Sequence, residues 1–153
     1  MRDNLQKLQD VDMEKFCADA SKRLAARLLQ LVIPDTPAGS YPASTGKKGG
    51  TLRRGWTAKT EAEAAGGSDD GKSKVAAYVN SLPITKRGNS YTVEVINPVN
   101  YASYVEFGHR TPGGKGLVNG QYFLTFAETQ LERKIPSILE KELEKLLRDI
   151  FKV

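Results

Sequence analysis

The chain has 153 residues, of which 39% are hydrophobic and 27% are charged, and a net charge of +5 places its isoelectric point near 9.3. This size allows one domain with a real core, so we expect residues 1–153 to form a single domain of ordinary soluble composition. The positive charge is spread thinly along the chain, which favours plain solubility over the concentrated basic face of a nucleic-acid-binding protein.

Several kinds of site and targeting segment are excluded by residue counts. The single cysteine, Cys17, allows neither an intrachain disulfide nor a zinc site built from cysteines. The opening residues, MRDNLQKLQDVDMEK, lack the apolar core of a signal peptide. No apolar run approaches the roughly 18 residues that a membrane span needs. We therefore expect a cytosolic protein, or one assembled in the cytosol, with no membrane partner.

Residues 3–32 predict one long amphipathic helix, because apolar residues recur at steps of three and four with one longer step. Pro34 is expected to end this helix. Residues 35–50 are rich in Pro, Gly, Ser and Thr and predict an exposed flexible loop with Lys47 and Lys48 at its mobile tip. The predicted apolar stripe of the helix consists of Leu5, Leu8, Met13, Phe16, Ala20, Leu24, Leu28 and Leu31.

Residues 51–60, TLRRGWTAKT, are a candidate strand. Alternation would place Trp56 on one face with Arg54 and Ala58, and Arg53 on the other face with Thr57 and Lys59. A core or interface position is favoured for Trp56 over a base-stacking role, because no other aromatic residue lies nearby on the strand.

The region that follows predicts the rest of a small, largely antiparallel sheet joined by hairpins. Residues 62–73 are expected to form a flexible hairpin tip, and the two acids in it, Asp69 and Asp70, lack the ligand pattern of a calcium loop. Residues 75–80 and 91–96 alternate as strands do, with turn residues at 86–89 between them.

Residues 97–127 form the most distinctive stretch. Asn100 is a good helix N-cap and Gly108 a good helix stop, so residues 101–107 predict a short aromatic helix. Its apolar side chains crowd two turns, which leaves surplus aromatic surface of the kind a subunit contact uses. These side chains are Tyr101, Tyr104, Val105 and Phe107. Residues 108–120, which follow, are expected to be a flexible basic loop.

The end of the chain predicts helices packed on the sheet. Residues 121–134 carry one apolar face, Pro136 is expected to kink or restart the helix, and a further apolar stripe runs from Ile138 to Ile150. The predicted fold class is therefore α+β: a long N-terminal helix, a small sheet with long flexible loops, a short aromatic helix and C-terminal helices.

No catalytic constellation is recognisable. The only histidine, His109, has no local nucleophile and cannot form a histidine-rich metal site. Gly113-Gly114-Lys115 is followed by Gly116 and Leu117, so the hydroxyl of a phosphate-binding P-loop is missing. Glu94 and Glu106 could approach each other as metal-binding carboxylates, but no spacing selects them, and Glu106 is expected to cap or pair at a surface. No cofactor and no metal are expected.

Two interpretations of the loop at 108–120 stay open. His109, Arg110 and Lys115 carry the charge that docking on an acidic neighbour or on passing DNA would use. A merely mobile loop is the alternative.

Two sets of residues resemble one known family. The first is Asn97-Pro98, then YASYVEFGHR at 101–110, then GLVNGQYFL at 116–124; the second is Thr36-Pro37, Thr45-Gly46 and LRRGW at 52–56. In this order they resemble the tailed-phage neck and tail-completion family named after gene product ten of coliphage HK-ninety-seven, with relatives in prophages and phage-tail-like bacteriocins. Residues 47–51 look like an insertion, Leu117 stands where many relatives have Trp, and Asn119 where many have Pro.

The resemblance implies a small α+β subunit of the virion neck or tail end, commonly one of six in a ring between the head connector and the tail tube. It implies that the protein completes the tail or joins it to the head, with the genome passing through the lumen. Self-association and contacts with connector, tail-tube or tail-terminator proteins would follow. We expect these contacts at Trp56, Tyr101, Tyr104, Phe107, His109, Arg110, Lys115, Leu117 and Tyr122.

Two other functions are weighed beside this structural, non-enzymatic one. A basic nucleic-acid-binding module would use Lys47, Lys48, Arg53 and Arg54, together with Arg110 and Lys115. The least favoured function is an enzyme with a carboxylate-bound metal.

Overall fold

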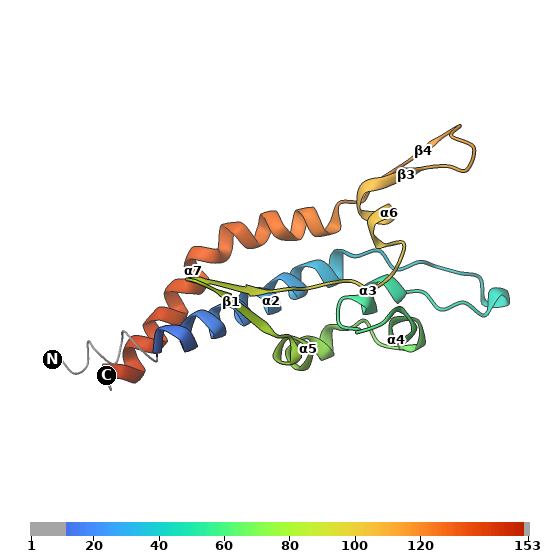
Figure 1. The fold of residues 1–153 in the computed structure, drawn as a ribbon. Coiled ribbons are helices and arrows are strands. Elements are labelled where there is room, and N and C mark those ends of the chain that lie inside the picture. The colour runs from blue at the N-terminus through green and yellow to red at the C-terminus, as the bar shows by residue number, and fades with distance from the viewer. Residues whose placement is uncertain (1–11, 152–153) are drawn as a thin grey trace.

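Two long antiparallel helices organise the structure, a computed structural model that describes residues 12–151 (Figure 1). They are α2, Asp12–Asp35, and α7, Phe123–Phe151. Arg23 Nε lies 2.9 Å from Glu142 Oε1 and links the two helices through an ion pair. Between them in the chain come η1 (Ala43–Thr45), α3 (Thr51–Gly55), α4 (Glu61–Gly66), η2 (Lys72–Lys74), α5 (Val75–Ser81), β1 (Ile84–Arg87), β2 (Ser90–Val93), α6 (Ala102–Phe107), β3 (Gly108–Arg110) and β4 (Leu117–Asn119). The predicted α+β class is confirmed.

The predicted N-terminal helix is confirmed over its described part, but its end and its buried face differ. The helix passes through Pro34 and ends at Asp35; a proline in the last turn removes only one backbone bond. Leu24, Leu28 and Leu31 are only half-buried. Leu5 and Leu8 lie outside the described residues. Ala20 of the predicted stripe is buried, and the other buried positions of the helix lie beside the stripe: Ala25, Leu29, Val32 and Ile33.

The strand predicted at residues 51–60 is wrong, because residues 51–55 form the helix α3. Arg54 is 5% exposed, and its guanidinium donates to the carbonyl oxygens of Ala64 at 2.6 Å and Gly49 at 3.0 Å. These bonds bind the short helix to the segments on either side of it, and they require a buried cation that alternation along a strand does not predict.

The strand predicted at 75–80 and the hairpin tip predicted at 62–73 are also wrong. Thr60 caps α4 by accepting a bond from the Glu63 N–H through its hydroxyl at 3.2 Å. In α5 the buried residues are Val75 and Val79, four apart, as on one face of a helix.

Within the described residues, the strands form two separate two-stranded antiparallel hairpins. In the first, Ile84 pairs with Val93 and Arg87 with Ser90, so the predicted turn at residues 86–89 is confirmed at 88–89. The predicted strand at 91–96 is shorter than expected, because pairing ends at Val93. The second hairpin, β3–β4, replaces the loop predicted at 108–120. α7 is one continuous helix that includes Pro136, so the predicted restart does not occur, and the helix bends along its length (Figure 1).

The core lies where α2, α3 and the start of α7 meet. Trp56 is 4% exposed, its indole N–H donates to the Thr36 hydroxyl at 2.7 Å, and its ring meets Phe123 edge-on at 6.2 Å. Trp56 therefore occupies the core position, one of the two predicted for it. None of the helices in the described range is long and apolar enough to cross a membrane.

Candidate subunit-contact surface

The buried carboxylate of Glu106 joins α6 to α7. Glu106 is 3% exposed, and its oxygens accept bonds from the backbone N–H groups of Leu124 at 2.9 Å and Thr125 at 3.0 Å. The Thr125 hydroxyl donates a third bond at 2.6 Å. A negative charge at the first turn of a long helix is also favoured by the helix dipole. Glu106 was expected to cap or pair at a surface; it does cap, but in the interior.

Backbone contacts close the chain into a loop beside this cap. The N–H of Gln121 donates to Val105 O at 2.9 Å and that of Tyr122 to Glu106 O at 3.0 Å. Gly108 has φ +82°, and a Cβ there would lie 2.3 Å from the backbone oxygen of Val118. Gly120 is equally crowded, because its Cβ would lie 2.3 Å from Glu106 O. The two ends of the segment 108–120 are therefore held close together by backbone contacts.

The segment 108–120 forms a β-hairpin that projects from the molecule (Figure 1). His109 pairs with Val118 and Arg110 with Leu117. Gly113 and Gly114 turn the chain with φ of +83° and +70°, values that favour glycine. The glycines that predicted a flexible loop thus form the turn of a regular element.

The hairpin is basic and exposed. Between Gly108 and Gly120 there is no acidic residue, and the predicted cations Arg110 and Lys115 are both exposed. His109 is exposed as well, and its ring meets that of Tyr104 edge-on at 5.7 Å.

Large apolar side chains are exposed on α6, on the hairpin and at the start of α7. We call them the apolar surface. Isolated exposed apolar residues are ordinary, but a group on three adjoining elements is typical of an interaction site. Its members are Tyr104 (57% exposed), Phe107 (64%), Leu117 (72%), Val118 (44%), Tyr122 (43%) and Phe126 (58%).

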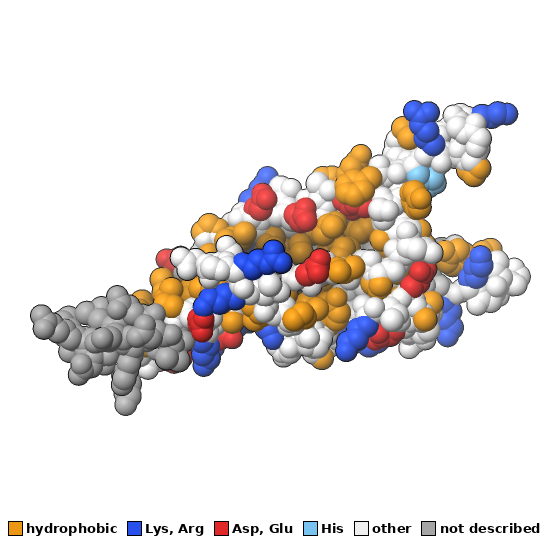
Figure 2. Space-filling view, in the orientation of Figure 1, with side chains coloured by type: hydrophobic (Ala, Val, Ile, Leu, Met, Phe, Trp, Pro, Cys, Tyr) orange, Lys and Arg blue, Asp and Glu red, His pale blue; other side chains and the backbone are white. Residues whose placement is uncertain are grey.

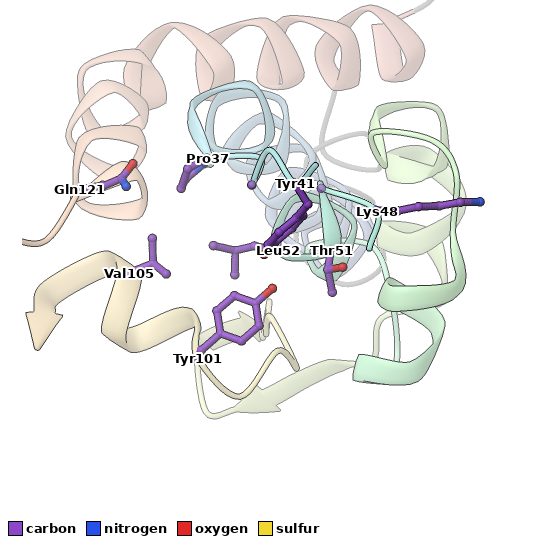
Figure 3. A pocket seen from close by; sticks show the side chains of 10 residues that line it. Pro37, Tyr41, Lys48, Thr51, Leu52, Tyr101, Val105 and Gln121 are labelled. Atoms are coloured by element: carbon purple, nitrogen blue, oxygen red, sulfur yellow. The ribbon is translucent and has the colours of Figure 1, made fainter. Parts of the chain in front are cut away.

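Tyr101 lies apart from this group, at a hollow of about 210 Å³ (Figure 3). Its side chain points towards Leu52 and Tyr41, whereas Lys48 points away (Figure 3). Burial raises the pKa of the Tyr101 phenol, and the neighbouring Tyr41 and Glu61 add to the rise. Tyr101 also takes the cap position of α6, without a side-chain bond, where Asn100 was expected.

The four cations proposed for DNA or an acidic partner are not equally available. Lys47 and Lys48 are exposed in the loop that carries η1, which extends from the same end of the molecule as the hairpin (Figure 1). Arg53 donates to the carbonyl oxygens of Thr36 and Pro34, and Arg54 is buried. The two arginines therefore form hydrogen bonds within the molecule and are less available to a partner.

Three exposed apolar residues, on the hairpin, at the start of α7 and after β2, were not among the predicted contact residues: Val118, Phe126 and Ile96. Phe126 could have been found from the sequence, because it falls outside the apolar face predicted for residues 121–134, which consists of Phe123, Leu124, Ala127 and Leu131. Within residues 12–151, no group of three or more His, Cys, Asp or Glu side chains could hold a metal ion.

The fold and this surface define a small α+β protein suited to assembly with other chains. Residues 1–108 match the family described as "Bacteriophage HK97-gp10, putative tail-component", and the chain belongs to this family. It is therefore a bacteriophage tail component, and the resemblance seen in the sequence is confirmed. The match ends where the hairpin begins. No curated protein and no solved structure matches the chain significantly.

Proposed function

We propose that this chain is a non-enzymatic structural subunit of the phage neck or tail end, which assembles into a closed ring of six copies. The ring completes the tail, as a tail-completion or tail-terminator protein, or joins it to the head connector. The genome passes through its lumen.

The observation that carries this proposal is the apolar surface at the end of the molecule. Phe107, Leu117 and Phe126 are each more than half exposed, whereas Trp56 and Phe123 are buried. Complete burial of an exposed Leu or Phe side chain stabilises an assembly by on the order of 1.5–3 kcal/mol, and these three side chains still have more than half of their surface to bury. A closed ring would cover this surface on every copy, which a monomer cannot do.

The partners that fit are other copies of the chain and the proteins above and below the ring. The exposed Lys47 and Lys48 extend from the same end as the hairpin and could meet acidic neighbours there. A dedicated nucleic-acid-binding module has less support, because Arg53 and Arg54 are bonded to carbonyl oxygens. Contact with DNA is therefore proposed only during its passage.

The proposal is tested by deleting the gene in a phage that encodes this chain and viewing lysates by electron microscopy. We expect filled heads and separate or overlong tails, with joined virions restored by a plasmid copy of the gene. Normal joined virions from the deletion strain would overturn the proposed role.

A further inference from the structure

An open apolar groove lies on the face between α7 and the segment that follows β2. Its volume is about 370 Å³. Figure 2 shows apolar side chains gathered along this face and acidic side chains on both sides of them. Ile96, 55% exposed, and Phe107, 64% exposed, leave much of the groove open to water. The remaining apolar lining comes from Trp56, Val95, Val99, Ala102, Phe123 and Leu124.

The edges of the groove are acidic. Glu94 is exposed and lies directly before the lining residues Val95 and Ile96. Glu128 follows the lining residue Leu124 by four residues and so lies on the same side of α7, with Glu132 one turn further. None of the three forms an ion pair with another residue of the described part of the chain.

The hairpin β3–β4 has the complementary chemistry. It has exposed apolar side chains at Leu117 and Val118, cations at Arg110 and Lys115, and no acidic residue. It extends away from the body of the molecule (Figure 1) and so does not cover the groove of its own chain. The acidic edges attract a basic partner and repel an acidic one, so the groove favours a partner that is both basic and apolar.

We propose that the groove binds the β3–β4 hairpin of a second copy, so that Leu117 enters it while Arg110, which pairs with Leu117, and Lys115 face its acidic edges. This inference rests on the proposed ring. The donor hairpin and the acceptor groove are different surfaces, so the contact is head-to-tail and each copy makes it twice, once with each neighbour. Such contacts close into rings when the rotation between copies allows it.

Two single substitutions test the contact in the full-length chain by sedimentation velocity. Leu117→Asp removes the donor and Ile96→Asp the acceptor; both side chains are more than half exposed, so an unchanged far-ultraviolet circular-dichroism spectrum will show that each variant folds. We expect each variant alone to lose the ring and sediment as a monomer. Thr85→Asp, an exposed site on β1, is the matched control and should keep the ring.

Mixing the two variants distinguishes this contact from other modes of assembly. Leu117→Asp keeps an intact groove and Ile96→Asp an intact hairpin, so one contact remains and the mixture should form dimers and nothing larger. If the wild-type chain forms a ring that both variants retain, the hairpin–groove contact is wrong and the proposed ring stands. A wild-type chain that is monomeric at every concentration overturns both.

Discussion

Glu106 accepts two bonds from Thr125, one from its backbone N–H at 3.0 Å and one from its hydroxyl at 2.6 Å. This pair fixes the start of the longest described helix against the short aromatic helix, and the hairpin projects from between them. The geometry of the proposed contact surface therefore depends on one buried carboxylate.

Replacing Glu106 with Ala should lower the free energy of unfolding by about 2–3 kcal/mol, because two N–H groups and a hydroxyl lose their acceptor. Urea unfolding followed by circular dichroism measures the change. Glu128→Ala, an exposed site on the same helix, is the control and should change stability little. Equal effects at the two positions would contradict the capping role.

The Trp56–Thr36 bond should show strong coupling in a double-mutant cycle. Thr36→Val leaves the buried indole N–H without an acceptor, at a cost of about 1–3 kcal/mol. Trp56→Phe removes both the donor and packing against Phe123. Because the second substitution also removes the unpaired donor, the double variant should be more stable than the sum of the single effects indicates. Strict additivity would mean that the bond contributes nothing.

Gly120→Ala should destabilise the base of the hairpin, since the added Cβ would lie 2.3 Å from Glu106 O, a backbone atom with little room to move. We expect a loss of roughly 2 kcal/mol or a displaced hairpin. Gly66→Ala is the matched control: it ends α4, its Cβ would meet nothing within 4 Å, and it should be neutral or slightly stabilising. Thermal unfolding of the two variants separates these outcomes.

Asp69 should make stability depend on pH in the acidic range. A bond from Lys74, followed by one from the Gly71 N–H, lowers the pKa of Asp69 below its usual 3.8. A carboxyl with a lowered folded-state pKa stabilises the protein above its unfolded-state pKa, and this contribution is lost as pH falls through the folded-state pKa. Because the pair is exposed and screened, Asp69→Asn should cost no more than about 1 kcal/mol at pH 7 and nothing near pH 2. A penalty that stays constant with pH would contradict this account.

The sequence predicted both long helices and the short one because their patterns extend over whole elements. The prediction for the middle of the chain was wrong for a specific reason. Apolar residues spaced four apart lie on one face of both a strand and a helix. Val75 and Val79 share a face in either structure, and only the exposure of Ala77 separates the two. In α3, the buried Arg54 is stabilised by carbonyl oxygens of distant segments, which local sequence cannot reveal.

The candidate surface was predicted in part. Tyr104, Phe107 and Leu117 are exposed as a contact surface requires, whereas Trp56 is buried in the core. The hairpin was not foreseen, because its pairing depends on the close backbone contacts at Gly108 and Gly120. It does not depend on an alternating pattern of apolar and polar residues. The groove was not foreseen either, since its lining comes from three separate parts of the chain.

Ring assembly is the central claim, and the solution mass of the wild-type chain tests it most directly. Light scattering coupled to size-exclusion chromatography should give, at high protein concentration, about six times the 16.8 kDa mass of one chain. A mass of one chain at every concentration, unchanged when connector and tail-tube proteins are added, would contradict it.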